Sequence, residues 1–191
     1  MSHKKTSRAF FERMYSTNSD PWNFASSEYE LRRYQTILNA LGGNRFEHAF
    51  EPGCSIGVLT EQLAARCDRV DAIDISPRAV ELTKARCRNL TNVHIACGSL
   101  LHHTLAGTFD LIMFCEIGYY FHEVDLRRIV LRLSDSMKSG ATMLAAHWLG
   151  SSPDHVLSGD DVHGILGDTE SLMHRYAERH SGFRLDRWSR R

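Results

Sequence analysis

Short apolar segments alternate along the chain with longer stretches in which apolar residues recur at the spacing of a helix face. Five apolar segments have the length of β-strands: residues 46–50, 70–75, 93–96, 109–114 and 141–148. The fourth segment is almost continuously apolar, which is typical of a strand buried on both faces. The stretches between them predict helices over residues 56–65, 77–89 and 124–137. Strands that alternate with helices predict an α/β fold with a mostly parallel sheet and helices on both faces.

The segments on either side of this core are predicted to be mainly helical. Residues 1–45 are interpreted as a helical amino-terminal cap, with apolar residues at helical spacing over residues 29–41. Three elements are predicted after the fifth strand: a short helix near Val162, a helix over residues 169–180 and a last strand over residues 183–188. We expect residues 1–191 to form a single domain, in which residues 46–191 are the core.

Composition and charge are those of an ordinary globular protein. The 191 residues fit the size of one domain, and 23 basic side chains balance 23 acidic ones. This balance argues against the large basic surface that binds nucleic acid or an anionic membrane. No apolar run is long enough to span a membrane or to act as an amino-terminal signal peptide. The five cysteines lack C-x-x-C spacing, which predicts no metal site and indicates a cytoplasmic protein with reduced thiols.

A loop rich in glycine follows the first predicted strand, with the sequence Glu51-Pro52-Gly53-Cys54-Ser55-Ile56-Gly57. At the carboxyl end of a strand, glycine lets a ligand approach the backbone near the positive end of the next helix. One interpretation is a tight turn that needs glycine for its geometry alone. The dinucleotide fingerprint G-x-G-x-x-G is a second, but it needs glycine where this chain has Ser55 and Val58. The third is a ligand with a cationic centre and an amino-acid head group, which would tolerate the acidic Glu51.

The next two strand ends also carry candidate binding residues. Asp74 ends the second strand, where a carboxylate can accept hydrogen bonds from both hydroxyls of a ribose. Its alternative role is to cap the following helix, for which Ser76 is also suited. Ser99 and Leu100 follow the third strand, where a loop can present polar groups to a nucleobase or form a generic turn.

Glu116, Tyr119 and Tyr120 leave the carboxyl end of the buried fourth strand. A carboxylate and two tyrosines are poor core residues, so we expect a functional role for this loop.

As a set, these loops resemble those of class I S-adenosylmethionine-dependent methyltransferases, over residues 46–148. The resemblance implies a Rossmann-like fold, with S-adenosylmethionine as cofactor, S-adenosylhomocysteine as product and no metal. It implies these cofactor contacts: Glu51, Gly53 and Gly57 with the methionine part, Asp74 with the ribose, and Ser99 and Leu100 with the adenine. Ile75 is a further cofactor-binding candidate, and Glu116 is expected near the methyl group. Ser55 departs from the glycine that is usual there.

A narrower resemblance extends over most of the chain. Its amino-terminal motifs are Phe11-Glu12-Arg13-Met14-Tyr15, Asp20-Pro21-Trp22-Asn23-Phe24, Ser27-Glu28-Tyr29-Glu30 and Arg33-Tyr34. With the glycine loop, His147-Trp148 and residues 159–163, they resemble the nodulation protein S family of rhizobia. This implies N-methylation of the free amine on the deacetylated, non-reducing-end glucosamine of a chitooligosaccharide during Nod-factor synthesis. Another small amine or a hydroxyl is the alternative acceptor, and a module that binds the cofactor without catalysis is the rival class.

This chemistry assigns roles to residues near the methyl group and in the cap. An amine attacks only through its free lone pair, so Glu116 or Tyr119 is expected to orient it or to take its proton. Trp22, which follows Pro21, is expected to cover the cofactor as part of a lid, or else to pack against the core. Arg33 can pair with the methionine carboxylate through its planar fork, or else it is a solvated helix arginine.

An oligosaccharide site needs aromatic faces for sugar rings and short polar groups for hydroxyls. Tyr120 and Trp148, with His147 and His163, are the candidate substrate-binding residues. The alternative is that Trp148 closes the core. Methyltransferases of this class end with a two-stranded hairpin, whereas the pattern here predicts one strand after the fifth, so we expect the final strand to be missing.

Overall fold

The computed structural model describes residues 7–191, which fall into two compact units, residues 7–103 and residues 104–191. The first six residues of the predicted cap lie outside the described residues. The remainder of the cap belongs to the same unit as the first three strands, so residue 45 marks no boundary between units. Within the described part of the chain, no helix is both long and apolar enough to cross a bilayer.

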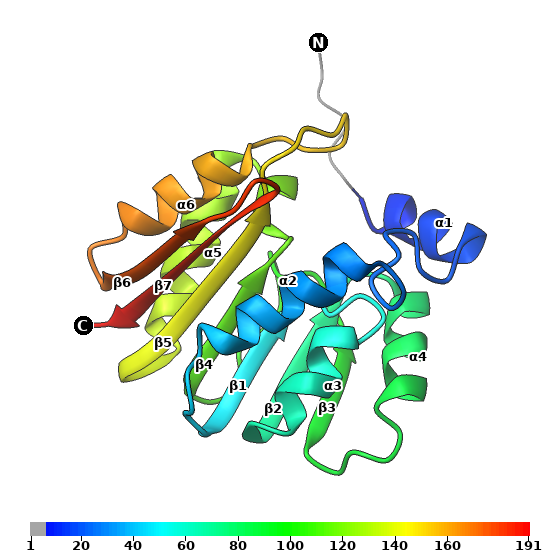
Figure 1. Cartoon of the computed structure of the whole chain (residues 1–191), viewed down its shortest axis with the longest axis horizontal. Helices are drawn as coiled ribbons and strands as arrows, with labels where there is room; N and C mark the ends of the chain where they lie inside the picture. Colours follow the sequence, from blue (N-terminus) through cyan, green and yellow to red (C-terminus); the bar gives the residue numbers. More distant parts are fainter. Residues whose placement is uncertain (1–6) are drawn as a thin grey trace. The chain divides into compact units, whose positions relative to one another are not determined.

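The unit of residues 7–103 contains a parallel three-stranded sheet and four helices (Figure 1). Its elements in chain order are α1 (Arg8–Thr17), α2 (Glu28–Asn39), β1 (Phe46–Pro52), α3 (Val58–Ala64), β2 (Cys67–Asp74), α4 (Pro77–Arg86) and β3 (Val93–Cys97). The strand order is β3-β2-β1, with Glu51 opposite Ala72 and Asp74 opposite Cys97. Because these strands are parallel, the loops that follow them leave the sheet at one edge.

Local sequence explains where α3 and α4 begin. Ser76 Oγ accepts a hydrogen bond from the Ala79 N–H at 3.2 Å, and Pro77 is the first helical residue, as the sequence predicts. Helix α3 follows Gly57, whose φ of 79° lies in the left-handed region. A Cβ atom on Gly57 would lie 2.7 Å from Cγ2 of Thr83, so only glycine allows α3 and α4 to approach this closely.

The unit of residues 104–191 contains the other four strands and two α-helices. Its elements are β4 (Phe109–Cys115), the 3-10 turn η1 (Gly118–Tyr120), α5 (Glu123–Asp135), β5 (Met137–Trp148), α6 (Gly159–Gly167), β6 (Leu172–Arg179) and β7 (Phe183–Arg190). The order is β4-β5-β7-β6, in which only the pair β4 and β5 is parallel. Helix α6 packs against β5, β6, β7 and α5 (Figure 1). Residues 111–114 of β4 are fully buried, which confirms the predicted buried strand.

The helix predicted over residues 169–180 is wrong, because most of this segment forms strand β6 (Figure 1). Most side chains of β6 are exposed, so its apolar residues do not alternate as they would in a half-buried strand. Leu172 and Tyr176 instead stand four residues apart, which imitates a helix face. The expected loss of the final strand is wrong for the same reason, since β6 and β7 pair as an antiparallel hairpin.

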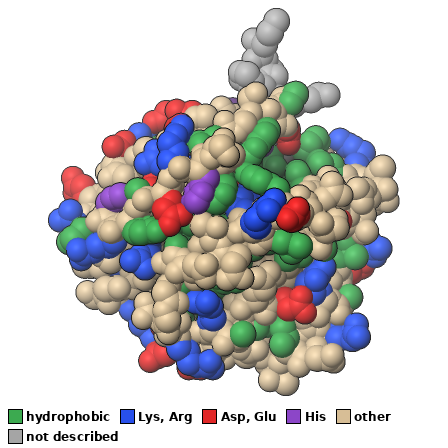
Figure 2. All heavy atoms as spheres, viewed as in Figure 1, with side chains coloured by type: hydrophobic (Ala, Val, Ile, Leu, Met, Phe, Trp, Pro, Cys, Tyr) green, Lys and Arg blue, Asp and Glu red, His purple; other side chains and the backbone are tan. Residues whose placement is uncertain are grey.

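Acidic and basic side chains are interspersed over the face drawn in Figure 2. This mixture agrees with the equal numbers of acidic and basic residues in the sequence. On that face, no continuous patch of one sign is visible.

Candidate active site

The loop after β1 is folded onto the end of β2. The N–H groups of Gly53 and Cys54 both donate to the carbonyl of Ile73, at 2.7 and 3.0 Å. Gly53 and Ser55 have φ angles of 78° and 52°, in the region that favours glycine. Ser55 is held there because its N–H donates to Oδ2 of Asp74 at 2.9 Å. The loop is therefore fixed in shape by β2 rather than by glycine alone.

Glu51 lies at the end of β1 and is only 4% exposed. Burial raises the pKa of its carboxyl group to about 8; the nearby Thr60 hydroxyl lowers the pKa, and the charge of Asp74 raises it. Among residues 7–191, no hydrogen-bond partner reaches Oε2 of Glu51. A buried carboxylate oxygen without a partner is unfavourable, and a cationic ligand group would satisfy it. These residues therefore fit the ammonium group of an amino-acid ligand.

Asp74 ties together the loops that follow β1 and β2. Its Oδ2 accepts from the Ser55 N–H and its Oδ1 from the Ser76 N–H, both at 2.9 Å. Burial raises the pKa of Asp74 to about 6, while these backbone hydrogen bonds lower it and the charge of Glu12 raises it. Each carboxylate oxygen has a further lone pair, so a ribose can still be bound. The sequence indicated that Asp74 contacts the ribose, and this stays a prediction. The sequence did not indicate that Asp74 also holds the two loops together.

The third loop is joined to the second in the same way. The Gly98 N–H donates to the carbonyl of Asp74 at 2.9 Å. Ile75 and Ser99 are half-buried beside it, and Leu100 is buried. The structure thus gathers the predicted cofactor residues of these three loops at one sheet edge, while their contacts with a cofactor stay predictions.

Helix α1 is hydrogen-bonded to two of these loops. The Tyr15 hydroxyl donates to Ser55 Oγ at 2.7 Å. Oε2 of Glu12 accepts from Ser76 Oγ at 2.5 Å and from the Arg78 N–H at 3.3 Å. Glu12 therefore lies at the start of α4, where the helix dipole favours a negative charge. Ser55, which departs from the usual glycine, is thus one of the two serines to which α1 is hydrogen-bonded.

Trp22 belongs to an aromatic cluster within the cap. Its ring centroid lies 5.6 Å from that of Tyr15 and 5.5 Å from that of Phe24, on which it stacks. Phe11 lies 6.5 Å away, and the ring of Trp22 stays half-buried. These contacts are all with other residues of the cap, so packing against the core and cover over a cofactor both stay predictions.

Arg33 is buried in α2, so the interpretation as a solvated arginine is wrong. Its Nη2 lies 2.5 Å from Oε2 of Glu30, and its guanidinium carbon lies 5.8 Å from the ring centroid of Tyr29. A buried arginine with such neighbours is fixed in orientation. Its pairing with a methionine carboxylate stays a prediction.

In the unit of residues 104–191, Glu116 follows β4 and is held by the end of β5. Its φ is 55°, and its N–H donates to the carbonyl of Ala146 at 2.9 Å. Its Oε1 accepts from the Trp148 N–H at 2.6 Å, and its Oε2 accepts from the Tyr119 hydroxyl at 2.9 Å. The two predicted catalytic residues are therefore in direct contact, and the carboxylate is oriented by two donors.

An aromatic cluster surrounds this pair, and it includes a histidine that the sequence did not indicate. The ring of His155 stacks on that of Tyr119 at 3.8 Å, with Tyr120 edge-on at 5.3 Å and Trp148 at 6.0 Å. Burial lowers the pKa of His155, against the charges of Asp154 and Glu116, which raise it. His155 lies in a loop without a motif, so its place beside Tyr119 carried no sequence signal.

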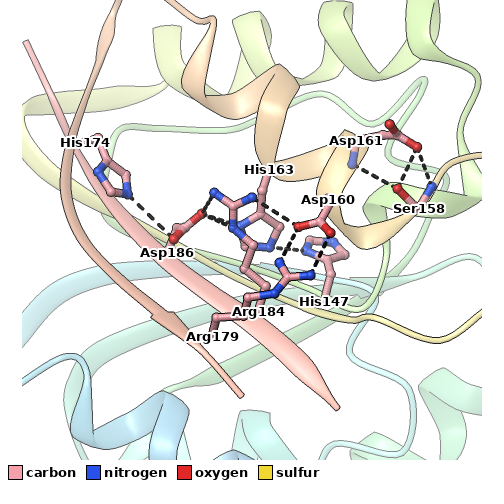
Figure 3. Close-up of polar contacts among 9 residues, drawn as sticks. All are labelled: His147, Ser158, Asp160, Asp161, His163, His174, Arg179, Arg184 and Asp186. Carbon is pink, nitrogen blue, oxygen red and sulfur yellow. Dashed lines mark hydrogen bonds and ion pairs between the residues drawn. The ribbon is translucent and has the colours of Figure 1, made fainter. Parts of the chain in front are cut away.

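His147 and His163 are fully buried and bonded to each other, at 0% and 1% exposure (Figure 3). His147 Nε2 accepts from the Gly118 N–H at 3.1 Å. The structure therefore brings Tyr120 and Trp148 to the Glu116 pair, as expected, but places the two histidines inside the fold. Their predicted contact with substrate has no support from this position.

A model of the family described as Nodulation protein S (NodS) matches residues 5–165 of the chain. Nodulation protein S of Sinorhizobium fredii (strain NBRC 101917 / NGR234) is 28% identical over 158 residues, which are 78% of this chain and 72% of that protein. Nodulation protein S of Rhizobium tropici is 29% identical, over 81% of this chain and 66% of that protein. The chain thus spans roughly two thirds of the length of these relatives.

Two solved structures are similar over most of the chain. The crystal structure of N-methyltransferase NodS from Bradyrhizobium japonicum WM9 in complex with S-adenosyl-L-homocysteine has a TM-score of 0.86 and 25% identity, covering 98% of this chain and 99% of that chain. A putative methyltransferase from Pseudomonas syringae has a TM-score of 0.77 and 34% identity, covering 86% of this chain and all (100%) of that chain.

Proposed function

Since the chain belongs to the NodS family of S-adenosylmethionine-dependent N-methyltransferases and has their Rossmann-like fold, we propose that it methylates the free amine of a deacetylated, non-reducing-end glucosamine in a chitooligosaccharide. The observation that carries this proposal is the family match over residues 5–165, which includes the cap, the glycine loop and the Glu116 loop. The residues of the site support it in two groups.

The first group binds the cofactor, and its main support is the buried carboxylate of Glu51. When bound, S-adenosylmethionine supplies a methyl group on a positively charged sulfur. Glu51 would receive the ammonium group, because its Oε2 has no other partner among the described residues. Asp74 would receive the ribose hydroxyls through its remaining lone pairs, and Gly53 and Gly57 let the ligand approach the loop backbone. Trp22 and Arg33 would complete the site from the cap.

The second group acts on the amine. The amine nitrogen donates its lone pair to the methyl carbon, the carbon–sulfur bond breaks, and its electron pair stays on sulfur. The nitrogen must be unprotonated beforehand, and Glu116 is the carboxylate held ready to accept a hydrogen bond or a proton from it. The Tyr119 hydroxyl and the Trp148 N–H fix the direction of that carboxylate. Holding the amine nitrogen and the methyl carbon in attack geometry can contribute roughly 7–11 kcal/mol of the barrier in well-aligned reactions.

The sugar ring is bound by aromatic side chains in this proposal. Tyr120 and Trp148 are both half-buried, so each can present a ring face to a pyranose. A Cβ atom on Gly150 would collide with the ring of Trp148, so glycine is what allows the ring to lie there. His147 and His163 are left out of this sugar site because they are buried.

The proposal is tested by giving the purified chain methyl-labelled S-adenosylmethionine together with chitin oligomers. We expect label in oligomers whose non-reducing end is deacetylated and none in fully acetylated oligomers of the same length. Glu116→Gln is expected to lower kcat while leaving the Kd for S-adenosylhomocysteine within about twofold, because the amide cannot accept a proton. Labelling of unrelated small amines or alcohols, with no label in the deacetylated oligomers, would contradict the proposed acceptor.

A further inference from the structure

A row of buried polar side chains leads away from the Glu116 loop. His147 on β5, His163 on α6 and Asp186 on β7 follow one another in this row (Figure 3). His147 Nδ1 lies 3.2 Å from His163 Nε2, and His163 Nδ1 lies 2.7 Å from Asp186 Oδ2. All three side chains are buried, and the row begins at the Gly118 N–H, 3.1 Å from His147 Nε2.

The first hydrogen bond fixes the position of every proton in the row. A backbone N–H can only donate, so His147 Nε2 must carry a free lone pair. Neutral His147 then has its proton on Nδ1 and donates it to Nε2 of His163. His163 in turn carries its proton on Nδ1 and donates to Asp186. Each of the two histidines therefore donates through Nδ1 and accepts through Nε2, Asp186 only accepts, and the direction of donation runs from Gly118 to Asp186.

Charged groups keep the far end of the row anionic. Burial would raise the pKa of Asp186, but the hydrogen bond from His163 and the charge of Arg184 hold it below its usual range. Arg184 Nε and Nη2 both lie 2.8 Å from Asp186 Oδ2, and His174 Nε2 lies 3.6 Å from Oδ1 (Figure 3). Burial lowers the pKa of His163, although Asp186 opposes this, which agrees with the neutral form that the row requires.

The near end of the row leads into the proposed catalytic loop. Gly118 stands between Glu116 and Tyr119 and packs without any intervening side chain against His147 and Val162. A Cβ atom there would lie 3.0 Å from His147 Nε2 and would collide with Val162. The ring of His147 also meets that of Tyr119 edge-on, at 5.4 Å. The row thus holds the backbone that carries both catalytic side chains.

We propose that His147, His163 and Asp186 form a positioning chain that sets the place of Gly118, and through it the orientation of Glu116 and Tyr119. The inference rests on the proposed function for the role of that loop. His147 and His163 are therefore positioning residues and do not contact substrate.

The direct test needs neither a variant nor an acceptor. Long-range proton–nitrogen NMR spectra of the full chain, with nitrogen-15 in its histidines, report which ring nitrogen carries the proton. We expect both His147 and His163 in the neutral form protonated on Nδ1, with Nε2 free of a proton. A proton on His147 Nε2 would overturn the proposal. A lack of sugar methylation would count against the proposed function alone, because these spectra do not depend on it.

A matched pair of variants tests the effect on the loop. His147→Leu removes the acceptor for Gly118, whereas His147→Gln provides an oxygen in its place. We expect the Gly118 amide signal to shift and kcat to fall about tenfold in the leucine variant, with substantial rescue in the glutamine variant. The Kd for S-adenosylhomocysteine should stay within about twofold in both.

His94→Gln is the control, since His94 is exposed on β3 and lies outside the row. It should leave the Gly118 signal and kcat unchanged. Equal loss of kcat in the leucine and glutamine variants, with an unmoved Gly118 signal, would overturn the positioning role.

Discussion

At the scale of single residues, Glu51 links cofactor binding to the stability of the empty protein. An exposed glutamate has a pKa of 4.5, and burial raises that of Glu51 to about 8. Between these two values the folded protein keeps a proton that the unfolded chain has lost. Raising the pH through this range therefore lowers the free energy of unfolding, and the contribution is fully lost above pH 8. Asp74, raised to about 6, acts in the same direction over a lower range.

We therefore predict that Glu51→Gln stabilises the empty protein in a pH-dependent way. Glutamine resembles the protonated carboxyl group, so the gain in Tm over the unaltered chain should be small near pH 5 and grow up to pH 8. Each kcal/mol gained corresponds to about 2–4 °C in a chain of this size. Thermal unfolding between these pH values measures the gain in Tm. Calorimetry should show weaker binding of S-adenosylhomocysteine by this variant, because Glu51 is proposed to receive its ammonium group.

The exposed Glu170 provides the control for this comparison. Glu170→Gln should change Tm by a similar small amount at every pH. A gain for Glu51→Gln that is constant from pH 5 to pH 8 would show that burial does not raise the pKa of Glu51.

At the scale of elements, helix α1 depends on polar contacts for its place on the cofactor loops. Tyr15 is its one buried residue within the described chain, and the helix is bonded through Tyr15 to Ser55 and through Glu12 to Ser76. A helix with so little buried surface gains little from packing, so single hydrogen bonds weigh heavily in its docking.

Tyr15→Phe removes one of these hydrogen bonds and keeps the ring. We predict faster amide hydrogen exchange over residues 8–17 and an increase of about threefold to tenfold in the Kd for S-adenosylhomocysteine, since one hydrogen bond is lost. Thr17→Val is the matched control, because the Thr17 hydroxyl donates to Arg13 within α1 and not to the loops. Equal exchange rates in the two variants would exclude docking through Tyr15.

Comparison of individual elements with their sequence patterns shows how far the sequence could predict the structure. The apolar run of β4 and the Ser76-Pro77 start of α4 are local signals, and both predictions are confirmed. Strand β6 was mistaken for a helix because an exposed edge strand has no alternating pattern. The bond between Tyr15 and Ser55 joins residues 40 positions apart, and the stacking of His155 on Tyr119 depends on the path of a loop. Contacts of this kind arise from tertiary packing and produce no periodic pattern in the sequence from which they could be predicted.

At the scale of the whole molecule, the proposed roles divide between the two compact units. Except for Glu116, the residues proposed to bind the cofactor lie in residues 7–103. Glu116, Tyr119, Tyr120 and Trp148, which are proposed to act on the acceptor, lie in residues 104–191. The family match covers residues of both units, which agrees with a reaction that needs both sets.

This division predicts that variants in the two units change different kinetic parameters. Asp74→Asn should raise the Kd for S-adenosylhomocysteine about tenfold, because a hydrogen-bonded carboxylate is lost, and leave the KM for the deacetylated oligomer within about twofold. Tyr120→Ala should raise that KM about tenfold and leave the Kd within about twofold, because it removes a ring face from the sugar. If the units bind their ligands independently, the double variant should show the Kd of Asp74→Asn and the KM of Tyr120→Ala together, with no further change in either. A weaker cofactor complex in Tyr120→Ala would instead show that one side chain serves both ligands.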